Sequence, residues 1–258
     1  MTTLLATSPA TLRPDVPCAD VPCPDVPCPD IPCAAAARGL IERLSARISA
    51  SVDEIAAFAT ADAALERIAT RYLAGSRVVL AQPTSEAIAA RAWSAARASQ
   101  VVVSDPTAGR LERLVAAARD ADVVVISSPV LSAVPSTAGG SPLGLPATIA
   151  PRELLLLRSR APRPIIVLDL LEEEYARTPL TQPALLLPGT IVLRGFGRAW
   201  SEVGAKAVAP LAFVAGPADL VARLEAPALD PAVAEAACAD LDLAAIDRAV
   251  RARVAEAA

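Results

Sequence analysis

Residues 165–207, IIVLDLLEEEYARTPLTQPALLLPGTIVLRGFGRAWSEVGAKA, contain two short runs of aliphatic and β-branched residues joined by a Pro-containing connection. The runs at 164–169 and 190–194 have the length and composition of strands that are covered on both faces of a sheet. Asp169 ends the first run, and the second leads into a segment that contains Arg198. The pattern predicts a carboxylate at the C-terminal edge of a parallel sheet, where open α/β folds bind ligands.

Further strands are predicted at 77–81, 100–104, 122–127 and 211–215, with helices at 84–98, 108–119 and 151–160. Pro151 and Glu153, preceded by Thr148, are typical of a helix N-terminus. Two more helices are expected before the first strand, one from residue 34 and one at 62–73 that ends before Gly75. A long Pro/Gly/Ser loop is expected at 127–147. This alternation of strands and helices predicts an α/β fold.

The composition excludes several classes of function. The 258 residues are 54% hydrophobic but only 3% aromatic, and they carry 24 basic and 28 acidic side chains with a net charge of −4. No basic stripe is available for a nucleic-acid backbone, and no apolar run reaches the roughly 20 residues of a membrane span. The N-terminus has no signal-peptide pattern, so a cytoplasmic protein is expected.

Missing residue types restrict the chemistry further. The chain contains no histidine and no asparagine, and Lys206 is its one lysine. Ser-His-Asp catalysis and His-ligated metals are therefore excluded. Any chemistry that forms an imine with an amine of a side chain must use Lys206.

A five-residue repeat of Asp, Val or Ile, Pro and Cys fills residues 14–33. Proline at this density favours an extended, polyproline-like segment, so residues 1–33 are predicted to be a disordered tail. Successive cysteines lie about 15 Å apart in such a chain, which does not suit one zinc ion. Metal binding, reversible thiol chemistry and a passive linker all stay open for Cys18, Cys23, Cys28 and Cys33, whereas Cys238 is interpreted as a small core residue.

The order of these elements resembles the large domain of class I/II pyridoxal-phosphate-dependent aminotransferases (fold type I), most closely the histidinol-phosphate aminotransferase type. The motifs that carry the resemblance are FATADAAL from Phe58, PTSE from Pro83, the loop after VVVISSP, the strand that ends in Asp169 and RGFGRAWSEVGAK from Arg194. It implies a three-layer α/β/α domain with a mainly parallel sheet over residues 34–225. Residues 226–258 are then a helical remnant of the family's small domain, so no substrate clamp is expected.

The resemblance assigns the cofactor residues. It places Asp169 beside the pyridine nitrogen of pyridoxal phosphate, where a carboxylate keeps the ring protonated. The family's Ser-Lys-Ala-Phe-Gly-Leu-Ala-Gly-Leu-Arg motif falls on Gly197–Lys206, which puts Arg198 in place of the imine lysine and Lys206 in place of the phosphate-binding arginine. A guanidinium stays protonated and cannot form the imine.

Other positions depart from the family's pattern. Ala61 and Asp62 fall where the family's phosphate cradle lies, and the negative charge of Asp62 would repel a phosphate there. The aromatic residue that stacks on the ring is absent after Pro83-Thr84, and the loop asparagine is absent from the whole chain. The tyrosine expected three residues after the aspartate is Glu172, with Tyr175 about one turn further on.

Three functions follow as hypotheses. The first is an aminotransferase-like protein that lacks transamination and acts by association, as a homodimer or as the partner of an active relative. The second is a pyridoxal-phosphate-dependent aminotransferase in which Arg198 and Lys206 have exchanged roles. The third is a thiol or metal-binding protein that uses Cys18, Cys23, Cys28 and Cys33.

Overall fold

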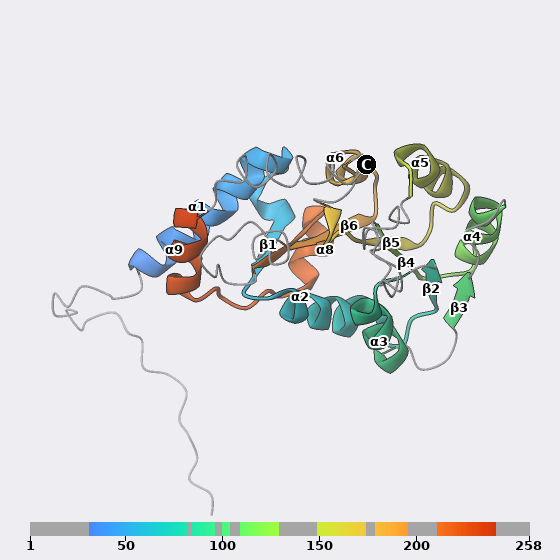
Figure 1. The fold of residues 1–258 in the computed structure, drawn as a ribbon, viewed down its shortest axis with the longest axis horizontal. Coiled ribbons are helices and arrows are strands. Elements are labelled where there is room, and N and C mark those ends of the chain that lie inside the picture. The colour runs from blue at the N-terminus through green and yellow to red at the C-terminus, as the bar shows by residue number, and fades with distance from the viewer. Residues whose placement is uncertain are drawn as a thin grey trace, which may run out of the picture.

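A single seven-stranded sheet organises the molecule. The computed structural model describes residues 31–81, 84–95, 100–103, 109–128, 149–173, 179–195 and 211–240. Within these ranges the strand order is β1-β7-β6-β5-β4-β2-β3, and the sheet runs through the middle of the molecule (Figure 1). The five strands from β6 to β3 are parallel, whereas β7 is antiparallel to both of its neighbours.

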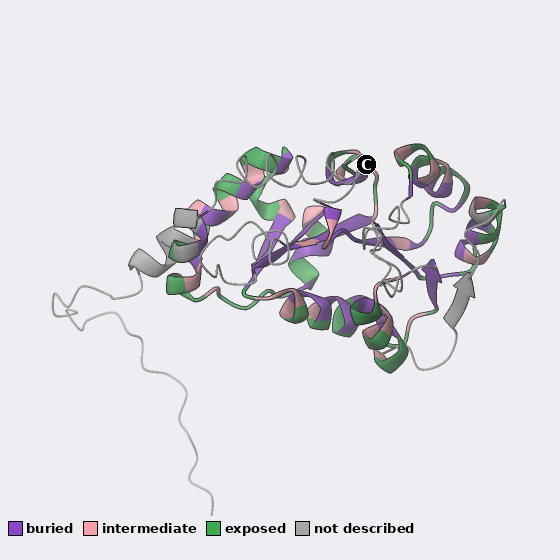
Figure 2. Cartoon of the chain, viewed as in Figure 1, coloured by how far each residue is buried: buried purple, intermediate pink, exposed green. Residues whose placement is uncertain are grey.

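Six of the strands lie where the sequence predicts them. They are β2 (Val78–Ala81), β3 (Gln100–Val103), β4 (Val123–Ser127), β5 (Ile165–Asp169), β6 (Thr190–Gly195) and β7 (Ala212–Ala215). Most residues of β2, β4, β5, β6 and β7 are buried, as expected for strands with helices on both faces (Figure 2). The prediction of a mainly parallel α/β fold is confirmed.

One face of the sheet is covered by α2 (Ala61–Ile68), the π-helical turn Ala69–Leu73 that continues it, α3 (Glu86–Ala95) and α8 (Ala218–Arg223). These helices contribute Leu65, Ile68, Leu73, Ile88 and Leu220 to a core that also contains inward residues of the strands. α2 begins at an N-cap, Thr60, whose side chain accepts a hydrogen bond of 3.0 Å from the N–H of Ala63. This cap satisfies a backbone group that the helix itself leaves unpaired.

The opposite face is covered in two parts. Helices α4 (Arg110–Ala118), α5 (Pro151–Arg160) and α6 (Thr181–Leu185) pack against β2, β4, β5 and β6. Helices α1 (Ile31–Ile48) and α9 (Pro231–Asp240) lie side by side at one end of the molecule, over β1 and β7 (Figure 1). The three layers predicted from the resemblance are therefore present.

The N-terminus of α5 follows the predicted signature with one difference. The carboxylate of Glu153 accepts a hydrogen bond of 2.8 Å from the N–H of Ala150, so Ala150 occupies the N-cap position. Pro151 fits the first helical position because its missing N–H would have no partner there. Thr148 lies outside the described residues.

Two elements were not predicted. The strand β1 (Ile55–Phe58) has the sequence IAAF, which lacks the run of valine and isoleucine seen in β4 and β5, and α6 has only five residues. Helix α1 begins at Ile31, so the last three residues assigned to the tail are helical. The rest of the tail and most of the 127–147 loop lie outside the described residues. No helix in the described ranges is long and apolar enough to cross a membrane.

Candidate functional site

Asp169 lies at the C-terminal edge of the sheet, as predicted. It is the last residue of β5, between Ser127 of β4 and Leu193 of β6 in the strand register. Only 3% of its surface is exposed. Its backbone carbonyl accepts a hydrogen bond of 2.9 Å from the N–H of Ser128, which continues the ladder past the end of β4.

The carboxylate of Asp169 accepts three hydrogen bonds from the protein itself. The hydroxyl of Ser85 donates to Oδ2 at 2.5 Å, and the hydroxyl of Ser127 donates to the same oxygen at 3.0 Å. The N–H of Leu171 donates to Oδ1 at 3.2 Å. Ser127 also accepts a hydrogen bond of 3.0 Å from the N–H of Ser85, so the two serines and the carboxylate form a closed network.

This network joins three elements that are far apart in the sequence. Ser85 directly precedes α3, Ser127 ends β4 and Asp169 ends β5. The carbonyl of Ser85 accepts a hydrogen bond of 3.0 Å from the N–H of Ala89, which places Ser85 at the start of the helix. Its hydroxyl donates to Asp169, so the network fastens the N-terminus of α3 to the edge of the sheet.

Burial raises the pKa of Asp169 above its ordinary value, because the charged carboxylate loses the hydration that water would give it. The hydrogen bonds from Ser85, Leu171 and Ser127 act in the opposite direction because they favour the charged form, but the net direction stays upward. The carboxyl group therefore keeps its proton to a higher pH than an exposed aspartate does. A neutral carboxyl is a weaker partner for a protonated ring nitrogen than a carboxylate is.

The N-terminus of α2, where the resemblance places the phosphate cradle, carries negative charge. Asp62 is an exposed first-turn residue, and its carboxylate pairs with Arg91 of α3 at 2.7 Å. The hydroxyl oxygen of Thr60 accepts the capping bond from the N–H of Ala63, and this bond does not use the hydroxyl's own proton. An anion at this helix end would therefore lie near the carboxylate of Asp62, whose charge is partly balanced by Arg91.

The structure does not describe every predicted site residue. Arg198, Lys206 and Tyr175 lie outside the described ranges, as do Cys18, Cys23 and Cys28. Cys33 is in α1, Cys238 is in α9, and Glu172 is half-buried just beyond β5. No group of three or more His, Cys, Asp or Glu side chains that could hold a metal ion occurs among the residues described.

A second buried polar cluster lies on the other face of the sheet. The carboxylate of Glu173 accepts hydrogen bonds from the N–H groups of Leu180 and Thr181 and from the Thr181 hydroxyl, and it pairs with Arg194 of β6 at 3.1 Å. A small cavity of about 270 Å³ beside it is also lined by Arg47. The cluster fixes α6 to β6, because the carboxylate binds groups from both elements.

Sequence reasoning missed Ser85, Ser127 and the Glu173–Arg194 pair. Ser85 and Ser127 each follow an apolar run at the C-terminal edge of the sheet, which is a positional signal that the sequence does carry. Arg194 breaks the apolar run of β6, and such a charge inside a buried strand needs a partner. The partner, Glu173, stands among three successive glutamates, and nothing in the sequence distinguishes it from Glu172.

The described residues include only part of what a pyridoxal phosphate site needs. The cofactor's aldehyde needs a lysine, and Lys206, the one lysine in the sequence, lies outside the described residues. Its ring nitrogen needs a carboxylate oxygen, and Oδ2 of Asp169 already accepts two hydrogen bonds while Oδ1 accepts one. Its phosphate is favoured by a neutral or positive helix terminus, and the first turn of α2 contains Asp62, which is paired with Arg91.

Comparison with solved structures identifies the fold. The chain superposes on histidinol-phosphate aminotransferase from Clostridium acetobutylicum with a TM-score of 0.63 at 13% identity, over 83% of this chain and 62% of that one. It superposes on aspartate aminotransferase from Rhizobium meliloti with a TM-score of 0.61 at 19% identity, over 86% of this chain and 56% of that one. L-threonine-O-3-phosphate decarboxylase from Porphyromonas gingivalis gives a TM-score of 0.60 at 16% identity, over 82% of this chain and 63% of that one.

These superpositions show that the chain has the fold of pyridoxal-phosphate-dependent aminotransferases, as the resemblance predicted. A histidinol-phosphate aminotransferase from Sinorhizobium meliloti that shares the fold was solved in complex with pyridoxal-5'-phosphate. The chain spans less than two thirds of the length of the structures described here. No family model matches the sequence, and no curated protein matches it.

Proposed function

We propose that this chain is an aminotransferase-fold protein that does not transaminate and that acts through association with a second copy of itself or with an active relative. The observation that supports this best is the closed Ser85–Asp169–Ser127 network. It uses the one carboxylate that the fold would offer to a pyridine ring for an internal structural purpose. Burial raises the pKa of this carboxyl, and three internal hydrogen bonds compete for its oxygens, so it is a weaker partner for a pyridinium ion than an exposed carboxylate is.

The sequence supports the same proposal at the imine position. Arg198 stands where the resemblance expects the lysine, and a guanidinium does not condense with an aldehyde. Lys206 is the one amine on a side chain that could do so, from a position where the resemblance expects a phosphate ligand. An active enzyme would require that Arg198 and Lys206 exchange ends of the cofactor.

Exposed apolar side chains support association. Among the described residues the large hydrophobic side chains at the surface are Trp93, Leu155, Leu186 and Val52, of which Leu186 is 84% exposed. Leu155 on α5 and Leu186 at the end of α6 belong to neighbouring helices. Covering such side chains with a second protein is favourable, because it removes apolar surface from water. The proposed partner is a second copy of the chain or an active relative.

A cofactor titration tests the inactive site. Pyridoxal phosphate is added to the purified protein and to Lys206→Ala, and absorbance near the edge of the visible range is followed. The proposal expects the same spectrum from both proteins and from free cofactor. A new band that Lys206→Ala lacks would support an active enzyme with exchanged residues instead. Light scattering over a concentration series tests association. A protein that stays monomeric and that does not bind an active relative would contradict the proposed association.

A further inference from the structure

The strand β1 is at the edge of the sheet and pairs only with β7 in the part of the chain that the structure describes. The N–H of Gly216 donates to the carbonyl of Glu54 at 3.0 Å. This bond shows which residues of β1 direct their backbone N–H and C=O groups toward β7. In an antiparallel pair, alternate residues point their polar groups at the partner strand. Ala56 and Phe58 therefore face β7, while Ile55 and Ala57 face outward.

Three backbone groups form this outward edge. The N–H of Ile55 already donates to the carbonyl of Val52, which leaves the carbonyl of Ile55 and both the N–H and the carbonyl of Ala57. None of the three has a hydrogen-bond partner among the described residues. Ile55 and Ala57 are 5% and 8% exposed. Buried backbone groups are nearly always paired, and Ile55 and Ala57 both line a cavity, so a ligand in that cavity would supply the missing partners.

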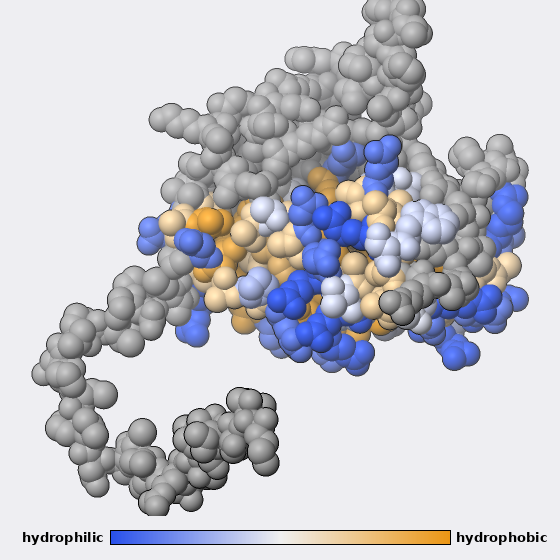
Figure 3. Space-filling view, turned by 90° about the horizontal axis from the view of Figure 1, so that it is seen from below, coloured by the Kyte–Doolittle hydropathy of each residue, from blue (hydrophilic) through white to orange (hydrophobic). Residues whose placement is uncertain are grey.

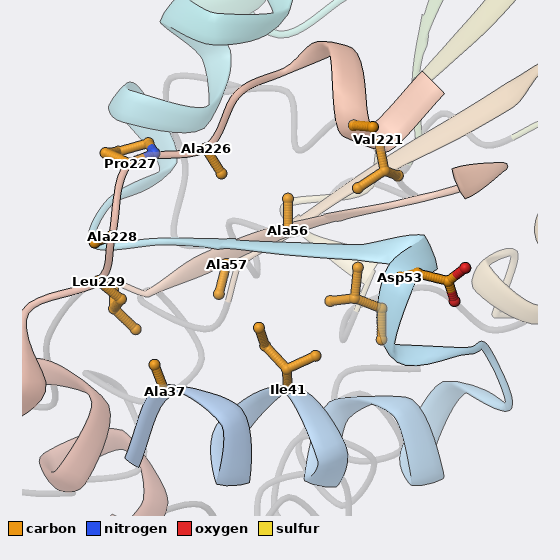
Figure 4. Close-up of a pocket in the computed structure, with 12 residues that line it drawn as sticks. Ala37, Ile41, Asp53, Ala56, Ala57, Val221, Ala226, Pro227, Ala228 and Leu229 are labelled. Atoms are coloured by element: carbon orange, nitrogen blue, oxygen red, sulfur yellow. The ribbon is translucent and has the colours of Figure 1, made fainter. Parts of the chain in front are cut away.

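The outward edge lies in a cavity of about 370 Å³ (Figure 4). Ala37 and Ile41 of α1 form one wall, and residues 226–229, which follow α8, form the other. Ala56 and Ala57 point from β1 to opposite sides, one toward Ala226 and one toward Ile41 (Figure 4). Small side chains line much of the cavity, and β1 contributes Ile55, Ala56 and Ala57 to its lining.

Asp53 is the one charged residue among those that line the cavity. It lies in the short turn before β1, it is exposed, and it forms no ion pair with another described residue. At the end of the molecule where α1 and α9 lie, hydrophobic side chains gather on the surface seen from below (Figure 3). The groove thus combines apolar walls, an unpaired strand edge and one negative charge at an end.

We propose that this groove binds an extended peptide segment of another protein, which adds to β1 as an eighth strand. The three backbone groups pair with the peptide backbone, and aliphatic side chains of the peptide enter the spaces beside Ala56 and Ala57. A lysine or arginine of the peptide lies next to Asp53. This inference does not depend on the state of the Asp169 site.

The test uses the full chain and a fluorescein-labelled pentapeptide amide, Lys-Val-Ala-Val-Ala, with binding measured by fluorescence anisotropy. Ala57→Pro removes the outward N–H and spares the ladder to β7, since proline is tolerated on an edge strand. It is expected to weaken binding about tenfold, which is the loss of one backbone hydrogen bond. Ala226→Trp fills the groove from an exposed position and is expected to abolish binding.

Matched controls make the result specific. Ala232→Trp adds the same bulk at an exposed position of α9 that does not line the cavity, and it is expected to bind the peptide as the wild type does. A peptide with Glu in place of Lys is expected to bind more weakly because it meets Asp53. A peptide methylated on its backbone nitrogens is expected not to bind.

Three outcomes would overturn the proposal. The first is equal affinity of the parent peptide for wild type and Ala226→Trp. The second is equal affinity of parent and methylated peptides, which would mean that the cavity holds side chains without strand addition. The third is no binding of the parent peptide or of variants in which Leu, Ile or Thr replaces Val. Circular dichroism confirms that each variant is folded. If Ala57→Pro does not fold, the binding measured with Ala226→Trp tests the proposal.

Discussion

The hydroxyl of Ser85 donates a hydrogen bond of 2.5 Å to Oδ2 of Asp169, across 84 positions of the sequence. The bond joins the start of α3 to the end of β5 at the edge of the sheet where open α/β folds bind ligands. In this chain the carboxylate at that edge has a structural role, which is the basis of the proposed loss of transamination.

Ser85→Ala is expected to lower the free energy of unfolding by about 1.5–3 kcal/mol, because it removes a hydrogen bond to a buried acid. Urea denaturation measures the change. Ser94→Ala on the same helix removes a hydroxyl that donates only to the carbonyl of Ala90 at an exposed position, so its effect is expected to stay within about 0.5 kcal/mol. Equal effects of the two substitutions would contradict the role assigned to Ser85.

The raised pKa of Asp169 predicts a specific dependence of stability on pH. An unfolded aspartate has a pKa of about 4, so below that pH the acid is protonated in both states. As the pH rises above about 4, the unfolded state loses its proton first, and the folded wild type loses stability until the pH passes the folded pKa. Asp169→Asn removes the contribution of this carboxyl group to the pH dependence of stability.

The unfolding free energy of the wild type minus that of Asp169→Asn should therefore fall from pH 4 upward and then level off. Chemical denaturation at a series of pH values gives this difference. A difference that rises with pH would show that the hydrogen bonds from Ser85, Leu171 and Ser127 outweigh burial, and that the carboxylate is charged and poised for a cation.

The buried pair of Glu173 and Arg194 predicts a large effect of one substitution. Glu173→Ala leaves the guanidinium of Arg194 without its carboxylate in a site where both side chains are largely buried, at 3% and 13% exposure. The expected loss is about 3–5 kcal/mol, measured by thermal or urea unfolding. Asp219→Ala, which breaks the exposed pair with Arg223, is expected to cost less than about 1 kcal/mol. A loss of that small size for Glu173→Ala would contradict the role of the cluster.

Substitution by alanine is expected to have opposite effects on stability at two glycines. A Cβ at Gly216 would lie 2.7 Å from the carbonyl oxygen of Thr190, so Gly216→Ala forces the backbone of β6 and β7 apart and should cost about 1–3 kcal/mol. A Cβ at Gly39 meets nothing within 4 Å inside α1, so Gly39→Ala should stabilise the protein by about 0.5–1 kcal/mol. Differential scanning calorimetry of the two variants tests both signs.

The sequence predicted six of the seven described strands from their short apolar runs, and it placed Asp169 correctly because such a run ends there. It did not predict β1, since Ile-Ala-Ala-Phe fits a helix as well as a strand and only pairing with β7 selects the strand. The hydrogen bonds from Ser85 and Ser127 depend on the parallel register of β4 with β5 and on the position of α3. These are tertiary relationships that no local pattern encodes.

Borohydride reduction tests the central claim most directly. The purified protein is incubated with pyridoxal phosphate, reduced with borohydride and digested, and the peptide that contains Lys206 is examined by mass spectrometry. We expect that peptide to keep its unmodified mass, as it does when pyridoxal phosphate is left out. A mass increase from a reduced pyridoxyl group on Lys206, obtained at stoichiometric cofactor, would contradict the account and show that the chain forms the imine after all.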